Sequence, residues 1–90
     1  MKTRIFLIGG FQKTKFLAKS LLKKGYHVTA INKDTEKCVA MAEIENLTVF
    51  NGDGTKPFVL EDADAYNADI AIALTEHTSY NNALGQVDFP

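Results

Sequence analysis

The chain has 90 residues, of which 46% are hydrophobic and 23% are charged, a composition typical of one small folded domain spanning residues 1–90. With 10 basic and 11 acidic side chains, the formal net charge is −1, and no basic cluster is large enough to neutralise several phosphates, which excludes nucleic-acid binding as the main role. The single cysteine, Cys38, excludes an internal disulfide and fits a reducing cytoplasm.

The first 32 residues predict a strand, a tight turn, a helix and a second strand, the βαβ unit that opens many nucleotide-binding α/β domains. Residues 4–8 are almost continuously apolar, as in a strand that helices cover on both faces of a parallel sheet. Gly9 and Gly10 end this strand. The chain starts with no long apolar stretch, so we expect neither a signal peptide nor direct insertion into a membrane.

A helix is predicted from Phe11 to Lys24, with one apolar side and one lysine-rich side that faces water. The apolar side is formed by Phe16, Leu17, Leu21 and Leu22. Gly25 ends the helix, and the β-branched and aromatic residues after it predict a strand up to Asn32. In this architecture, the ribose of a bound nucleotide lies at the end of that second strand.

Two shorter helix–strand units follow. Asp34 is a suitable N-cap for a second helix. The inward side of this helix is predicted to contain Cys38, Val39, Met41 and Ala42. Residues 47–50 predict a buried third strand, and the turn formers of residues 51–55 redirect the chain into a helix from Pro57 to about Ala65.

Residues 68–74 predict a fourth apolar strand, and residues 75–82 a polar loop that starts a fourth helix. Strands that alternate with helices at this spacing predict an α/β fold, a Rossmann-like doubly wound parallel sheet of strand order 3-2-1-4 with right-handed crossovers. The fourth strand would lie at an edge. Such an apolar edge requires cover, and domains of this type usually continue with further strands.

The sequence LIGG…LAKSLLKKGYHVTAINKD, followed by NGDGT and ADIAIALTEHTSYN, resembles the N-terminal nucleotide-binding domain, of RCK or KTN type, of Trk-type potassium-uptake regulators. The resemblance covers residues 2–82, and its most specific parts are GDGT at residues 52–55 and Thr75 with Asn81 after an apolar strand. It implies a cytoplasmic regulatory domain that binds an adenine nucleotide (AMP, ADP or ATP) or NAD(H). It also implies a homodimer or larger ring that acts on a membrane potassium channel or transporter at the inner face of the plasma membrane.

The sequence departs from the family pattern at several positions. The glycine motif G-x-G-x-x-G of this family falls on Gly9, Phe11 and Thr14, so only its first glycine is present. Phe11 would crowd a pyrophosphate, which indicates a single phosphate at this turn. Asn32 replaces an acidic residue that takes both ribose hydroxyls, and Thr78 stands where aspartate is common.

The candidate ligand-binding residues follow the ends of the predicted strands. A phosphate is expected at the strand-to-helix turn, ribose at the end of the second strand, and the adenine edge at the glycine-rich turn, with Thr75 near ribose and phosphates. The set comprises Gly9, Gly10, Phe11, Thr14, Asn32, Lys33, Gly52, Asp53, Gly54 and Thr75. The alternative is that these residues only build turns and that the lysines only face water.

No catalytic constellation is present in the sequence. His27 and His77 lie at opposite edges of the predicted sheet, and the single cysteine has no base beside it, so we expect no enzyme activity and no metal site. Three functions remain open. They are a nucleotide-binding regulator, an interaction or dimerisation module that has lost its ligand, and a fragment of an NAD-dependent oxidoreductase.

Overall fold

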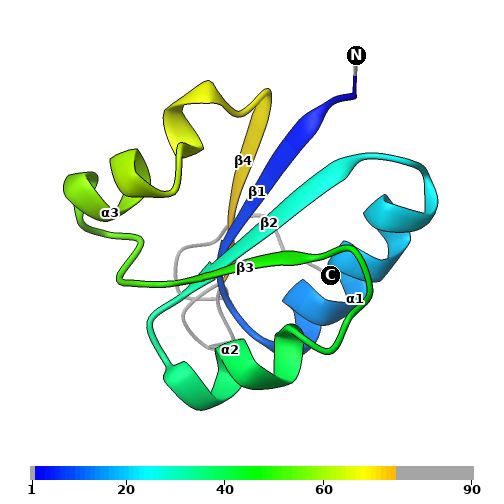
Figure 1. The fold of residues 1–90 in the computed structure, drawn as a ribbon, viewed down its shortest axis with the longest axis horizontal. Helices are drawn as coiled ribbons and strands as arrows, with labels where there is room; N and C mark the ends of the chain where they lie inside the picture. The colour runs from blue at the N-terminus through cyan, green and yellow to red at the C-terminus, as the bar shows by residue number, and fades with distance from the viewer. Residues whose placement is uncertain (1, 75–90) are drawn as a thin grey trace, which may run out of the picture.

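The computed structural model describes residues 2–74, which form a four-stranded sheet with helices between successive strands (Figure 1). In chain order the elements are β1 (Arg4–Gly9), α1 (Gln12–Lys23), β2 (His27–Asn32), α2 (Thr35–Met41), β3 (Thr48–Asn51), α3 (Pro57–Asp62), the 3₁₀ turn η1 (Ala65–Asn67) and β4 (Ile70–Leu74). The predicted helix after residue 74 lies outside the described residues, as does Thr75.

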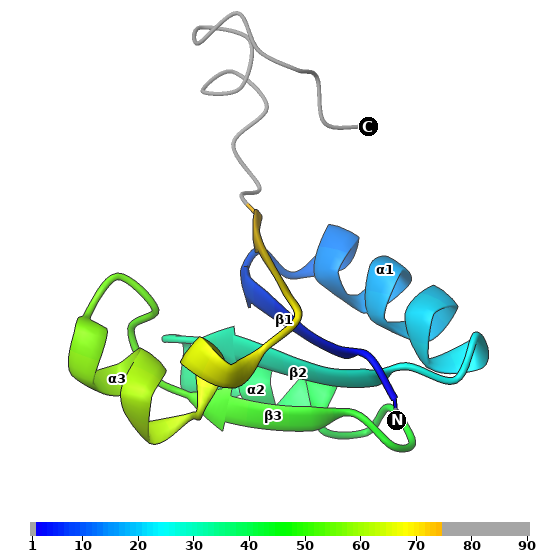
Figure 2. The ribbon, with the colours of Figure 1, turned by 90° about the horizontal axis from the view of Figure 1, so that it is seen from above.

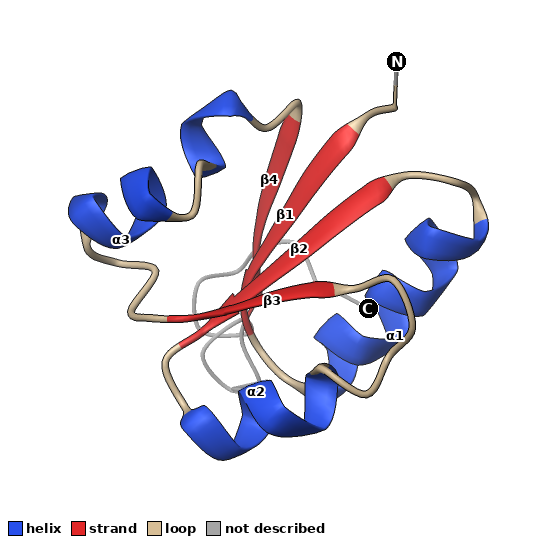
Figure 3. Ribbon diagram, viewed as in Figure 1, coloured by secondary structure: helices blue, strands red, loops and turns tan. Residues whose placement is uncertain are grey.

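All neighbouring strands pair in parallel, in the order β3-β2-β1-β4 (Figure 3). Leu7 in β1 is aligned with Ala30 in β2 and with Ile72 in β4, so β1 is bonded on both sides. The predicted Rossmann-like α/β fold with strand order 3-2-1-4 is therefore confirmed. Because every strand runs in the same direction, the carboxyl ends of all four meet at one edge of the sheet.

The two faces of the sheet are covered by different helices. α1 and α2 lie on one side, with α1 running alongside β1 and β2, and α3 lies on the other (Figures 1 and 2). Successive residues of β1 enter opposite cores, since Leu7 packs with Ala18 and Met41, whereas Phe6 packs with Val59. This explains why β1 is apolar throughout.

The inward face of α1 differs from the predicted one. Thr14 and Ala18 are fully buried, and Leu17, Leu21 and Leu22 pack beside them. The prediction for Phe16 is wrong, because its side chain is 78% exposed. Phe16 follows Thr14 by two residues, about 200° around the helix, and so points away from the sheet.

The second helix is capped as predicted, since Asp34 Oδ1 accepts hydrogen bonds from the backbone N–H groups of Glu36 (2.9 Å) and Lys37 (3.2 Å). Cys38 and Met41 are buried, as predicted. Val39, at 63% exposure, and Ala42 were predicted on the wrong side. A helix this short buries only the narrow stripe that Cys38 and Met41, three residues apart, define.

Both outer strands are more exposed than the sequence indicates. The third strand was predicted to be buried over residues 47–50, but it comprises Thr48–Asn51 and both of its end residues are exposed. β4 begins at Ile70, two residues after the predicted start of the strand, and Ile70 is 46% exposed. Within the described residues each of these strands pairs on one side only, which explains both outcomes. Across residues 2–74, no helix has the length and apolarity required to span a bilayer.

Candidate functional site

A cleft of about 590 Å³ opens at the carboxyl ends of the strands. It contains six of the predicted site residues, Gly9, Gly10, Asn32, Lys33, Asp53 and Gly54. The lining is completed by Ile8, Ile31, Asp34, Lys37, Thr55, Ala73 and Leu74. The sequence analysis did not single out this second group as site residues, although most of them stand at strand ends or in the turns already identified.

The turn between β1 and α1 is built by two glycines with positive φ, 84° at Gly9 and 68° at Gly10. A Cβ atom on Gly9 would lie 2.8 Å from the carbonyl oxygen of Leu74, so a side chain here would push β4 away. Thr14 Oγ1 donates a hydrogen bond to Gly9 O (2.7 Å) from a fully buried position. Thr14 therefore fixes the turn and is not one of the residues that line the cleft.

Phe11 lies beside the cleft, at the N-cap position of α1. Its ring packs against the core beneath α1, with Lys15 Nζ 4.2 Å and Lys37 Nζ 5.8 Å from the ring centroid. Both ammonium groups are within the range of cation–π attraction. The Phe11 ring thus contacts one cation from α1 and one from α2. Phe11 is not part of the cleft lining.

Asn32 connects three turns at the end of β2. It is only 6% exposed; its Nδ2 donates to Gly10 O (2.7 Å) and its Oδ1 accepts from the backbone N–H of Asp34 (2.8 Å). Its backbone carbonyl accepts from Gly52 N (2.9 Å) and from Asn51 Nδ2 (3.0 Å). The side chain therefore holds the β1–α1 turn against the start of α2.

The turn after β3 approaches the sheet closely because it carries two glycines. A Cβ atom on Gly54 would lie 2.4 Å from Ile8 Cγ2, and one on Gly52 would lie 2.7 Å from Val59 Cγ1. Asp53 Oδ1 accepts from both Thr55 N (2.9 Å) and Thr55 Oγ1 (2.7 Å). These hydrogen bonds, and more weakly the charges of Lys33 and Lys56, lower the pKa of Asp53.

Cys38 and His27, which the sequence analysis considered as reactive side chains, do not line the cleft. Cys38 is buried within α2; burial raises the pKa of its thiol, and Sγ donates to Asn32 O (3.3 Å). His27 is exposed at the amino-terminal end of β2, away from the cleft. Residues 2–74 contain no group of three His, Cys, Asp or Glu side chains that could hold a metal. His77, Thr78 and Asn81 lie outside the described residues.

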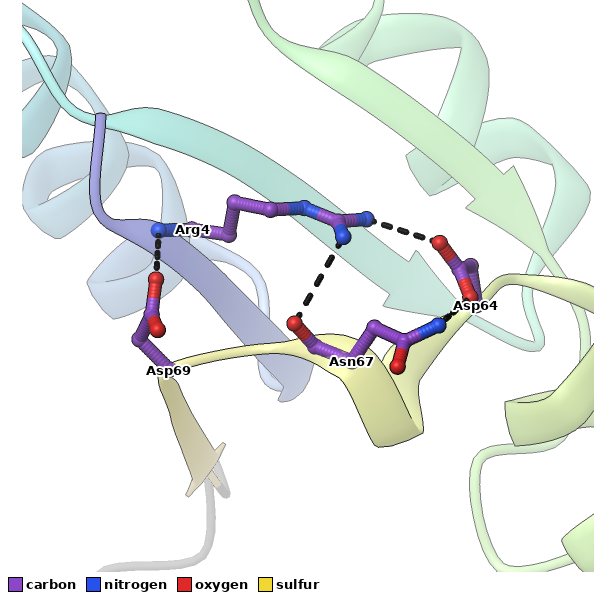
Figure 4. A network of polar contacts seen from close by, with 4 residues as sticks. All are labelled: Arg4, Asp64, Asn67 and Asp69. Carbon is purple, nitrogen blue, oxygen red and sulfur yellow. Dashed lines mark hydrogen bonds and ion pairs between the residues drawn. The ribbon is translucent and has the colours of Figure 1, made fainter. Parts of the chain in front are cut away.

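A polar network that the sequence analysis missed lies at the opposite edge, where β1 and β4 begin (Figure 4). Arg4 forms an ion pair with Asp64 (3.0 Å), and its backbone N–H donates to Asp69 Oδ2 (2.8 Å). Asn67 Nδ2 donates to Asp64 Oδ1. This network ties η1 and β4 to β1 and lies outside the cleft.

An all-parallel sheet of order 3-2-1-4, with a cleft across its carboxyl ends and glycines at both turns that approach it, defines a Rossmann-like α/β domain. A family model described as the TrkA-N domain matches residues 5–86. The chain therefore belongs to the TrkA-N domain family, as the resemblance in the sequence indicated.

Relatives with this similarity are named as potassium uptake proteins. The chain is 29% identical to the Trk system potassium uptake protein TrkA of Vibrio alginolyticus over 96% of its own length and 19% of that protein. It is 34% identical to a Trk system potassium uptake protein trkA homolog 1 of Methanosarcina mazei, over 89% of the chain and 20% of the relative. The chain thus spans about a fifth of the length of these relatives.

Proposed function

We propose that the chain is a cytoplasmic, non-catalytic regulatory domain of a potassium uptake system and that it binds an adenine nucleotide or NAD(H) in the cleft. The observation that carries the proposal is that the cleft brings together Gly9, Gly10 and Asn32 from β1 and β2 with Asp53 and Gly54 from the turn after β3. Ligands of doubly wound α/β sheets bind outside the carboxyl ends of the strands, where the strand order reverses. Here that point lies between β1 and β4.

Each part of the nucleotide has a place in this proposal. The phosphate lies over the glycine turn, near the first backbone N–H groups of α1, which carry the positive end of the helix dipole. The adenosine extends across Ile8 and Ile31, and its base lies at the turn of Asp53 and Gly54, which approaches Ile8 closely because Gly54 has no side chain. The ribose lies near Lys33.

The regulatory step is proposed to act through association. Nucleotide binding would stabilise one arrangement of a dimer or larger ring, and that arrangement would bias a membrane potassium transporter or channel. The support for a transport partner is that the relatives are named as Trk system potassium uptake proteins. Any contact with the membrane would then pass through this partner.

Thermal unfolding with ATP, ADP, AMP, NAD and NADH tests the proposal. A ligand at 100 times its Kd stabilises the native state by about 2.7 kcal/mol, which raises the midpoint of a domain this size by roughly 10–20 °C at about 4–8 °C per kcal/mol. GTP and inorganic phosphate are the ligand controls. No shift with any adenine nucleotide would contradict the proposal.

A matched pair of variants tests whether the cleft is the binding site. Ala73 and Ala71 are exposed residues on the same face of β4, but only Ala73 lines the cleft. Ala73→Leu should fill part of the cleft and abolish the thermal shift, whereas Ala71→Leu should preserve it. An equal effect of both substitutions would place the ligand elsewhere.

The second candidate function is an interaction module without a ligand. The observation that favours it is that Asn32, the residue at the expected ribose position, uses its amide to join two turns of the chain itself. Association that no nucleotide affects would support this function.

A further inference from the structure

The expected ribose end of the cleft has no carboxylate at the end of β2. At this position of a dinucleotide-binding fold, an acidic side chain bonds the ribose 2′-hydroxyl of NAD, whereas a basic side chain nearby accommodates the 2′-phosphate of NADP. Asn32 is neutral, and its Nδ2 and one lone pair of its Oδ1 are already used by Gly10 and Asp34. The carboxylate that would accept the ribose hydroxyls is thus absent from the end of β2, and one lone pair of Asn32 Oδ1 is the acceptor left there.

Two cations line the cleft, one directly after β2 and one at the start of α2. Lys33 directly follows Asn32 and is exposed, and Lys37 projects from the first turn of α2. A lysine in the first turn opposes the helix dipole, so the helix gains nothing from a cation at Lys37. Within residues 2–74, neither ammonium group forms an ion pair.

Two carboxylates also line the cleft, and one oxygen of each accepts hydrogen bonds from donors in its own turn. Asp34 Oδ1 accepts two backbone N–H groups of α2. Asp53 Oδ1 accepts the N–H and the hydroxyl of Thr55. With an acid at position 32 the lining would carry a net negative charge; with Asn32, two lysines balance two aspartates whose charges are already stabilised by hydrogen bonds.

We propose that this end of the cleft takes a phosphorylated ribose, so that the ligand is a 2′-phosphoadenosine nucleotide of the NADP(H) class and not NAD(H). The inference rests on the proposed function, because it places an adenine nucleotide in the cleft. Lys33 and Lys37 hold the 2′-phosphate by charge-assisted hydrogen bonds, which are stronger than those a neutral hydroxyl makes.

Calorimetric titration of the full 90-residue chain with two matched ligand pairs tests the inference. AMP and adenosine 2′,5′-bisphosphate differ only in the 2′-phosphate, as do NAD and NADP. We expect the 2′-phosphorylated member of each pair to bind about tenfold more tightly, a difference of about 1.4 kcal/mol. The preference should shrink at about 1 M salt, where the Debye length falls to about 3 Å.

Charge-neutralising variants locate the preference. Lys33→Gln and Lys37→Gln should each lower the affinity for the bisphosphate more than that for AMP, and the double variant should remove the preference. Lys19→Gln, an exposed mid-helix lysine outside the cleft lining, is the control for loss of one positive charge. Circular dichroism of each variant checks that the fold is retained.

The outcomes separate this inference from the proposed function. Equal affinity for the members of each pair would overturn the phosphorylated ribose and leave nucleotide binding intact. A preference that survives in the double variant would overturn the role of the two lysines. Binding of neither member would overturn both proposals.

Discussion

At the scale of single residues, two glycines separate the effect of backbone conformation from that of available space. Gly9 and Gly25 both have positive φ, 84° and 93°, but only Gly9 has an atom in the way, Leu74 O. Gly25→Ala should cost about 1–2 kcal/mol from the left-handed backbone alone. Gly9→Ala should cost roughly 1–3 kcal/mol more, because β4 must shift. Urea unfolding measures both, and equal losses would contradict the close contact.

A second residue-scale prediction concerns Asn32→Asp, which restores the acid that the family pattern carries. Because Asn32 Nδ2 donates to Gly10 O at 2.7 Å in a buried position, a carboxylate there would face a carbonyl oxygen without a proton between them. We expect a loss of about 1–3 kcal/mol at pH 7. Asn46→Asp is the control for the added charge, since Asn46 is exposed and outside the cleft lining.

The pH dependence of that loss has a definite sign. The introduced acid would have a folded-state pKa above its unfolded value, because burial and the carbonyl oxygen favour the protonated form. The penalty relative to the unmodified chain should therefore be largest above the folded-state pKa and decrease as the pH falls through it, when the protonated acid donates to Gly10 O. Urea unfolding of both chains at several pH values tests this, and a penalty independent of pH would contradict it.

The sequence predicts the position of Asn32 at the end of a strand, but it does not predict the hydrogen-bond partners of Asn32. The end of a strand is readable from the apolar run before it, and Asp34 is readable as a cap. The hydrogen bond to Gly10 O joins residues 22 positions apart and depends on the register of β1 against β2. Periodicity within one segment does not specify that register.

At the scale of elements, strand order followed from the alternation of strands and helices, whereas the rotation of each helix did not. The lysine positions in α1 allow either Phe16 or the small residues Thr14 and Ala18 to face the sheet. Close packing favours the small pair, because α1 can then approach β1 and β2. Apolar character alone assigned Phe16 and Val39 to the core, and both are exposed.

The network of Arg4 and Asp64 gives an element-scale prediction, since it joins β1 to the segment that precedes β4. The side-chain hydrogen bonds from Arg4 and Asn67 lower the pKa of Asp64 in the folded chain. A lowered folded-state pKa means that this contribution is present above the unfolded pKa and is lost as the pH falls through the folded pKa. Asp64→Asn should therefore flatten the acid limb of the stability curve.

Asn is a suitable replacement because Asp64 has φ 65°, a conformation that Asn tolerates. Urea unfolding midpoints measured from neutral to acid pH provide the readout. Asp62→Asn, an exposed residue at the end of α3, controls for general charge loss. Identical acid limbs for the unmodified chain and Asp64→Asn would show that the ion pair makes no pH-dependent contribution.

At the scale of the whole molecule, the described residues form a sheet with two buried central strands, β1 and β2, and two more exposed outer strands, β3 and β4. β1 and β2 carry most of the core, whereas the end residues of β3 and residues 70, 71 and 73 of β4 are exposed. A chain of this length gains little surplus stability from its own core. Ligand binding and association are therefore expected to have large relative effects, which makes them the most informative measurements on this domain.

The proposed coupling of nucleotide to association makes a quantitative prediction. By linkage, a ligand that prefers the associated state must tighten association by the same factor by which association tightens ligand binding. For a coupling of about 1–3 kcal/mol, the dimer dissociation constant should fall roughly 5- to 150-fold when the nucleotide is saturating.

Sedimentation velocity over a range of chain concentrations, with the nucleotide that gives the largest thermal shift, measures this fall. A nucleotide that gives no thermal shift is the control. Tight nucleotide binding with an unchanged dissociation constant would contradict coupling through the dimer while leaving the binding site intact, and the regulatory signal would then have to pass through a single copy of the domain.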